Sequence, residues 1–137
     1  MKINTLIIDD DINWQKILGK FVQMNPLLEL VGVCGSVMEG YAKMAEKEVD
    51  LLICDIEMPE MSGLDFIKSI RYAPCVIFVT AHRDYALDCY DVSPVDFLLK
   101  PLDLDRFLQS IEKVRQRLAV LPEESFVSPY FVVRENL

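Results

Sequence analysis

Acidic residues directly follow two of the short apolar runs in this chain. Residues 3–8 are followed by a triplet of aspartates, and residues 51–54 are followed by Asp55. Carboxylates that lie close together raise one another's pKa, and a divalent cation between them offsets this repulsion. Mg²⁺ suits such a cluster, because it binds carboxylate oxygens and keeps several waters that a phosphate can replace. The spacing therefore indicates a magnesium site.

A hydroxyl and an ammonium group follow two further apolar runs. Thr80 comes after residues 75–79, and Lys100 comes after residues 95–99. Metal, carboxylate, hydroxyl and ammonium together indicate phosphoryl transfer, which depends mostly on positioning and charge neutralisation. Each residue alone has an ordinary structural explanation, and Asp11 is predicted only to cap the next helix. It is the combination at successive strand ends that indicates function.

Five apolar runs are predicted to position these groups as strands. They are rich in Ile, Val, Leu and Phe and do not alternate with polar residues, which is typical of a parallel sheet covered on both faces. In chain order they are residues 3–8, 28–34, 51–54, 75–79 and 95–99. Helical segments alternate with them, so we expect a right-handed, doubly wound α/β sandwich. Ligands of such sheets bind at the carboxyl ends of the strands.

Apolar residues that recur with a helical period predict the helices. The stripes are Trp14, Ile17, Leu18, Phe21 and Val22; Met38, Tyr41 and Ala45; Leu64, Ile67 and Ile70; and Leu104, Phe107, Leu108, Ile111, Val114 and Leu118. Ser36 with Glu39 and Ser62 with Asp65 form capping patterns at two helix starts. Residues 83–91 make the weakest predicted helix, because the segment is short and mixed in polarity.

Length and composition favour one compact domain. The chain has 137 residues, of which 52% are hydrophobic and 26% charged, with only 5 Gly and 7 Pro. This composition excludes a disordered or collagen-like chain. The net charge of −8 makes a grip on nucleic acid through the domain's own surface a poor hypothesis.

The cysteines and the N-terminus indicate a soluble, cytoplasmic location. Four cysteines lie far apart without a C-x-x-C pair and are predicted to be buried thiols in a reducing compartment: Cys34, Cys54, Cys75 and Cys89. No signal-peptide core forms before Asp9. No apolar run approaches the ~18 residues that span a bilayer, so we expect no membrane contact.

Four motifs in order resemble the receiver domain of two-component response regulators. They are IIDDD at 7–11, LICDIEMPEMSG at 52–63, VTA at 79–81 and DFLLKP at 96–101. The resemblance covers residues 1 to about 118. It implies a flavodoxin-like (βα)5 fold with a five-stranded parallel sheet in the order 2-1-3-4-5 and five helices.

The resemblance also implies the chemistry at the first two motifs. Asp55 is the expected phosphoryl acceptor, attacking the phosphohistidine of a sensor histidine kinase. Asp10 and Asp55 would bind Mg²⁺ (or Mn²⁺), together with the backbone carbonyl of Glu57. Asp9 would help directly or through a water molecule.

The later motifs imply a switch. Lys100 would pair with the phosphoryl oxygens, and the Thr80 hydroxyl and the Ala81 N–H would hydrogen-bond another oxygen. Phe97 occupies the position of the family's switch aromatic, which turns inward as Thr80 moves, and the peptide bond to Pro101 is usually cis. Movement of Thr80 would bias the packing of the face formed by the fourth helix, fifth strand and fifth helix.

His82 lies two residues after Thr80 and flanks the expected site. It is predicted to tune the lifetime of the phosphoryl group, and the alternative is a plain helix-start residue. Replacement of His82 would separate the two, because only a tuning residue changes the rate of dephosphorylation.

The C-terminal residues suggest a subfamily. Residues 80–87 and 96–101 resemble regulators that carry a LytTR-type DNA-binding domain, and residues 130–134 are similar to the first strand of such a domain. We therefore expect a receiver at 1–120, with a linker and a truncated C-terminal domain at 121–137. The alternatives for the terminal strand are docking on a sheet edge or pairing with a second molecule, and the chain could also be a stand-alone receiver.

The expected function is signalling rather than turnover of a substrate. The chain would catalyse only its own phosphorylation and dephosphorylation, form a homodimer when phosphorylated, and reach DNA through a domain that is missing. An aspartate-nucleophile phosphohydrolase is the enzymatic rival, but its D-x-D motif has Glu57 at the second position here. A flavodoxin-like binding module would need a phosphate loop where the aspartate triplet lies. A pseudo-receiver that acts by binding alone is the third alternative.

Overall fold

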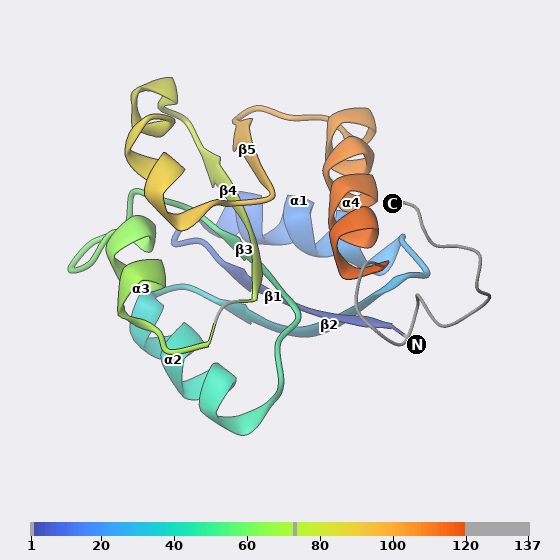
Figure 1. Ribbon diagram of the computed structural model, residues 1–137, viewed down its shortest axis with the longest axis horizontal. Helices are drawn as coiled ribbons and strands as arrows, with labels where there is room; N and C mark the ends of the chain where they lie inside the picture. The colour runs from blue at the N-terminus through green and yellow to red at the C-terminus, as the bar shows by residue number, and fades with distance from the viewer. Residues whose placement is uncertain (1, 73, 120–137) are drawn as a thin grey trace.

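Five parallel strands form one sheet in the computed structural model, which describes residues 2–72 and 74–119 (Figure 1). The strands are β1 (Ile3–Ile8), β2 (Leu28–Cys34), β3 (Leu51–Cys54), β4 (Cys75–Thr80) and β5 (Asp96–Leu99). Their order is β2-β1-β3-β4-β5, as the resemblance implied. The chain first adds β2 on one side of β1 and then crosses to β3 on the other side. The predicted sheet is confirmed, with strand bounds within one residue of those expected.

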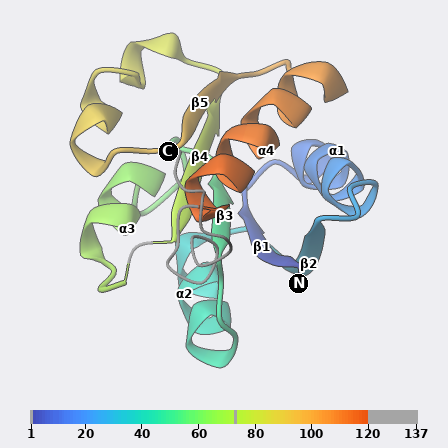
Figure 2. The ribbon, with the colours of Figure 1, turned by 45° about the vertical axis from the view of Figure 1, so that its right-hand side comes forward.

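Four α-helices cover the two faces of this sheet: α1 (Ile12–Gln23), α2 (Val37–Glu46), α3 (Gly63–Ser69) and α4 (Leu104–Ala119). Figure 2 shows α1 and α4 on one side of the sheet and α2 and α3 on the other. Each face has its own apolar cluster, because successive side chains of a strand point to opposite faces. Leu6 and Ile8 of β1 pack with α2 and α3, whereas Ile7 packs with α1 and α4.

The segment between β4 and β5 corrects the prediction of a fifth α-helix. It forms two short 3₁₀ helices instead, η1 (Arg83–Tyr85) and η2 (Asp88–Val92). Ser93 then adopts a left-handed backbone conformation with φ of 50°. The segment buries Cys89 but no continuous apolar stripe, so it lacks the packed face that normally stabilises a helix of this length.

The apolar face predicted for α2 is also wrong. Met38 and Tyr41 are 65% and 59% exposed, and the helix packs inward through Val37 and Gly40 instead. A Cβ atom at Gly40 would lie 2.3 Å from the Ile8 side chain, so only glycine allows this close approach. The helix therefore approaches β1 along its small residues and leaves the larger ones outside.

The predicted helix starts are confirmed. The Asp11 side chain accepts a hydrogen bond from the backbone N–H of Asn13 at the start of α1. Ser36 and Ser62 accept in the same way from the N–H groups three residues later, at the starts of α2 and α3. These bonds satisfy helix N–H groups that have no partner within the helix.

All four cysteines are buried and unpaired, as predicted. Within the described residues, no helix is both long enough and apolar enough to cross a membrane. The linker and truncated domain predicted at 121–137, including the strand predicted at 130–134, lie outside the described residues.

Candidate functional site

Three aspartates meet where β1 and β3 end side by side. Ile8 and Cys54 are paired in the sheet, and the N–H of Asp55 donates to the carbonyl of Ile8 at 2.9 Å. One carboxylate oxygen each from Asp9, Asp10 and Asp55 lies within 4.8 Å of the other two. Asp9 and Asp55 are buried, whereas Asp10 is exposed to solvent. The adjacency of β1 and β3 therefore assembles the predicted acidic cluster.

Lys100 reaches this cluster from the end of β5. Its backbone N–H donates to the carbonyl of Thr80 at 2.8 Å, which continues the pairing of β4 and β5. Its ammonium donates to Asp55 Oδ2 at 3.0 Å and lies 2.9 Å from Asp9 Oδ2. The Lys100–Pro101 peptide bond is cis, as the resemblance implied.

The charges of this cluster are unbalanced, because three carboxylates face one ammonium. Burial is the largest influence on Asp55 and, together with the charge of Asp9, raises its pKa to about 6 against the opposing effect of Lys100. Burial disfavours the charged form of Lys100, but its contacts with Asp9 and Asp55 outweigh burial and raise its pKa. The ammonium is therefore held charged beside carboxylates that repel one another.

The carboxylate oxygens of the acidic cluster are suitable ligands for a divalent cation. Asp9 Oδ2 is buried and accepts no well-directed hydrogen bond from the described residues, although the Lys100 ammonium is close enough for an ion pair. Burial of such an oxygen lowers the stability of the fold unless a positive group lies beside it. Carboxylate oxygens are ligands that suit Mg²⁺ and Mn²⁺. The acidic cluster could therefore hold a metal ion of this kind.

A polar bridge formed by Glu57, His82 and Tyr85 lies beside Asp55. The N–H of Glu57 donates to Asp55 Oδ1 at 3.1 Å, so the bridge is attached directly to the acidic cluster. The Glu57 carboxylate lies 2.8 Å from His82 Nε2 and accepts a hydrogen bond from the Tyr85 hydroxyl at 3.0 Å. Glu57 and His82 are expected at the site from the sequence, whereas Tyr85 is not. Nothing in the spacing of residues 57 and 85 signals that they meet.

The Thr80 hydroxyl lies at the end of β4 without contacting Asp55. Thr80 is buried at the end of β4, and its hydroxyl accepts a hydrogen bond from the N–H of His82 at 3.3 Å. In the described part of the chain, no hydrogen bond joins this hydroxyl to Asp55. Ala81 follows in an exposed turn.

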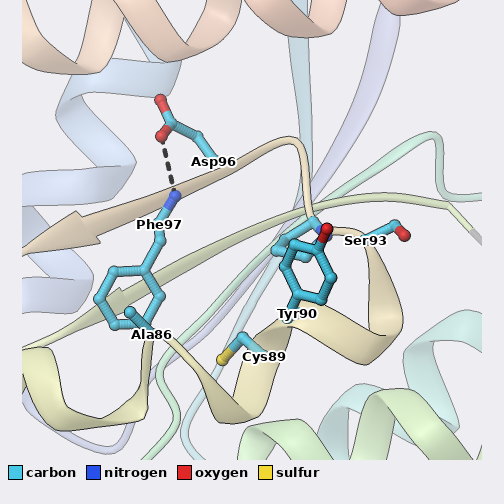
Figure 3. Close-up of a pocket in the computed structure, with 7 residues that line it drawn as sticks. Ala86, Cys89, Tyr90, Ser93, Asp96 and Phe97 are labelled. Atoms are coloured by element: carbon cyan, nitrogen blue, oxygen red, sulfur yellow. Dashed lines mark hydrogen bonds between the residues drawn. The ribbon is translucent and has the colours of Figure 1, made fainter.

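Phe97 lies farther from the acids, between two cavities. One cavity, of about 380 Å³, is lined by Ala86, Cys89, Tyr90, Ser93, Pro94, Asp96 and Phe97 (Figure 3). In that view the Phe97 ring extends from β5 toward Ala86 on the segment after β4. The other cavity, of about 410 Å³, is lined by Phe97, Leu99, Pro101, Leu102, Asp103 and Arg106. Phe97 therefore lines open space toward η2 and toward the turn at Pro101.

The chain is similar to known proteins of one family. Residues 5–112 match the family model described as the response regulator receiver domain. The transcriptional regulatory protein BtsR of Escherichia coli (strain K12) is 32% identical over 128 residues, covering 88% of this chain and 54% of BtsR. The sensory transduction protein LytT of Enterococcus faecalis is 31% identical over 127 residues, covering 90% of this chain and 52% of LytT. This chain thus spans about half the length of the curated relatives it matches.

A solved structure supports the fold. The response regulatory domain of protein mrkE from Klebsiella pneumoniae superposes with a TM-score of 0.77 and covers 84% of this chain and 97% of that chain. Its sequence identity is 21%, so the likeness concerns the fold and not the chemistry of the site.

Proposed function

This chain belongs to the response regulator receiver domain family, and on this premise we propose that Asp55 accepts a phosphoryl group from the phosphohistidine of a sensor histidine kinase. The observation that carries the proposal is the meeting of Asp55 with the Lys100 ammonium, at 3.0 Å, inside the acidic cluster. A buried carboxylate with a raised pKa and a specific cationic partner is typical of a functional site.

The chain's own residues orient Asp55 for attack. The Glu57 N–H holds Oδ1 and the Lys100 ammonium holds Oδ2, so the carboxylate has one defined orientation. One of these oxygens forms the new bond to phosphorus, the bond from phosphorus to the histidine nitrogen breaks, and the electron pair leaves with the imidazole. Lys100 then neutralises part of the charge on the phosphoryl oxygens.

Asp10, Asp55 and the Glu57 backbone carbonyl would hold Mg²⁺ (or Mn²⁺), with Asp9 assisting directly or through water. The buried Asp9 Oδ2, which has the Lys100 ammonium as its one cationic neighbour among the described residues, and the shared position of the three carboxylates support this assignment. When bound, the ion supplies positive charge opposite the phosphoryl oxygens. Asp9 in turn keeps Lys100 and Asp11 in place, since its Oδ1 accepts from the N–H of Asp11 at 2.9 Å.

Phosphorylation would switch the face around Phe97. The Thr80 hydroxyl and the Ala81 N–H would bind a phosphoryl oxygen, and Thr80 would then give up its contact with the His82 N–H. The two cavities that Phe97 lines, one beside η2 and one beside the turn at Pro101, support a second position for the ring. Because Phe97 has no hydroxyl, its two positions would differ by packing alone.

His82 is proposed as the residue that tunes the lifetime of the phosphoryl group. Its contact with Glu57, and that of Tyr85 with the same carboxylate, join the loop after β3 to the loop after β4 beside Asp55. The polar bridge would control how water approaches the acyl phosphate.

The output of this receiver is proposed to be transcriptional. The relatives BtsR and LytT are named as a transcriptional regulatory and a sensory transduction protein, and the matched region covers only 54% and 52% of them. The proposal is a linker and the start of a LytTR-type DNA-binding domain at 121–137, a homodimer formed on phosphorylation, and no catalysis beyond the chain's own phosphorylation and dephosphorylation. The four unpaired buried cysteines support a reducing, cytoplasmic location.

Intact mass after incubation with Mg²⁺ and acetyl phosphate tests the acceptor. We expect one added phosphoryl group on the wild type, none on Asp55→Asn, and none when a chelator is present. An adduct that survives the substitution would show a different nucleophile, and no adduct on either protein, with rapid loss of label excluded, would favour the pseudo-receiver. Steady hydrolysis of a phosphate ester would favour the phosphohydrolase.

A further inference from the structure

Trp14, the only tryptophan of the chain, lies beside the acceptor site without any role in the function proposed above. It is half-buried on α1 and packs against the apolar cluster that α1 and α4 form on one face of the sheet. The centre of its ring lies 5.5 Å from Nζ of Lys100. At separations up to about 6 Å, an ammonium group is attracted to the face of an indole ring.

The ring completes the surroundings of the Lys100 ammonium. Asp9 Oδ2 and Asp55 Oδ2 lie 2.9 and 3.0 Å away, and the Lys100 side chain is only 10% exposed. Little water therefore competes for the ammonium. The attraction between a cation and an aromatic ring is stronger when the cation is removed from water.

The ring differs from the two carboxylates in what else it can bind. Asp9 and Asp55 belong to the acidic cluster, so their oxygens are shared between Lys100 and any cation held there. Phosphoryl transfer also converts the Asp55 carboxylate into an acyl phosphate, which changes this contact of Lys100. An indole ring is not among the oxygen ligands that hard divalent cations prefer. Its hold on the ammonium is therefore independent of the state of the cluster.

We infer that Trp14 is a positioning residue whose ring holds the Lys100 ammonium toward the phosphoryl group during transfer to Asp55. The inference rests on the proposed function, because it concerns the same reaction. Trp14 would then increase the rate of the reaction, in addition to packing as part of the apolar stripe of α1.

Three substitutions of Trp14 separate the cation contact from packing. We would measure phosphorylation by acetyl phosphate with Mg²⁺, by intact mass, for Trp14→Tyr, Trp14→Phe and Trp14→Leu. The maximal rate of the Leu variant should fall roughly five- to thirty-fold, the ratio that corresponds to a desolvated cation–π contact. Tyr and Phe should retain most of the rate, and the donor concentration for half-maximal rate should stay unchanged. A wild-type rate in the Leu variant, or equal losses in the Leu and Phe variants, would overturn the inference.

Tryptophan emission tests the contact without any reaction and without replacing Trp14. Because the chain has one tryptophan, its emission reports this ring alone. Lys100→Met should change the emission, whereas Lys16→Met, which removes an exposed charge from the same helix as Trp14, should not. Identical emission from all three proteins would overturn the inference even if a Trp14 variant failed to fold.

The two proposals fail in different ways. A wild type that takes up no phosphoryl group would contradict the proposed function. A wild type that is phosphorylated, with the Trp14→Leu variant no slower, would contradict only the role of Trp14.

Discussion

Asp55 and Asp96 are equally buried but have opposite surroundings. Their side chains are 8% and 9% exposed. Burial raises the pKa of both, yet the pKa of Asp55 is about 6 and that of Asp96 is about 2. Their neighbours differ far more than their side-chain exposure does, and these neighbours hold the two pKa values apart.

Asp96, the first residue of β5, is surrounded by donors. The Arg106 guanidinium binds both of its oxygens at 2.9 and 3.0 Å, the Ser110 hydroxyl donates at 2.6 Å, and the Lys113 ammonium lies 3.2 Å away. These contacts, with the N–H of Phe97, outweigh burial and lower the pKa of Asp96. They also tie β5 to α4.

Asp55 has one cationic partner, and acidic neighbours share it. The Lys100 ammonium contacts Asp9 as well as Asp55, and Asp10 adds a third carboxylate. A carboxylate whose charge is fully balanced by hydrogen-bond donors and cations stabilises the fold. A carboxylate whose charge is only partly balanced can still bind a cation or react with a phosphoryl group. The Asp96 cluster is therefore structural, and the Asp55 cluster is suited to chemistry.

The largest expected difference concerns phosphorylation. Asp96→Asn should still take up one phosphoryl group from acetyl phosphate, because Asp96 lies outside the acidic cluster, whereas Asp55→Asn should take up none. Intact mass after incubation with Mg²⁺ measures both. Loss of the adduct in a folded Asp96→Asn protein would contradict the division into a structural and a chemical region.

The same pair of substitutions should change stability in opposite directions. Asp96→Asn should lower the free energy of unfolding by about 3 kcal/mol, because Arg106 and Lys113 lose their shared anion. Asp55→Asn should raise it by about 1 kcal/mol, because a charge no longer has to be buried and repulsion from Asp9 is removed, which together outweigh the lost contact with Lys100. Urea unfolding at pH 7 with a chelator present measures the two values. Destabilisation of similar size in both variants would contradict the comparison.

The pH dependence of stability should identify the charge of Asp96. Because its pKa is lower in the folded protein than the ordinary value of 3.8 for an aspartate, its charge contributes stability that is complete above about pH 4. About 2 kcal/mol of this contribution should be lost as the pH falls through about 2. The difference in unfolding free energy between wild type and Asp96→Asn, measured from pH 7 down to pH 2, should therefore stay constant and then shrink. A difference that grows as the pH falls would contradict the prediction that the charge of Asp96 stabilises the folded protein.

The smallest expected effect concerns the polar bridge. The His82 and Glu57 side chains are about half exposed, and solvent-exposed pairs contribute little, so His82→Ala and Tyr85→Phe should change the half-life of the phosphoryl group by at most about five-fold. Mass spectrometry after removal of the donor measures this half-life. Arg83→Ala, at an exposed neighbouring position, is the control. Half-lives equal to wild type in both bridge variants would leave His82 as a plain helix-start residue.

The sequence by itself determined the sheet and the positions of the acceptor groups. Apolar runs without alternation predict buried parallel strands, and residues at the carboxyl ends of such strands meet at one edge whatever the details of packing. Asp9, Asp55 and Lys100 therefore come together as expected. Helix caps were predictable for a similar reason, because Asp11 and Ser62 bond to N–H groups only two or three residues away.

Only the tertiary structure decided the contacts between side chains that are distant in sequence. Arg106 binds Asp96, Tyr85 binds Glu57, and the ring of Trp14 faces Lys100 because of the angles at which helices and loops pack on the sheet. The inward face of α2 likewise depends on the fit of Gly40 against Ile8. Periodicity shows which residues share a face of an element. It does not show which side chains from separate elements touch, since that depends on close packing across the whole fold.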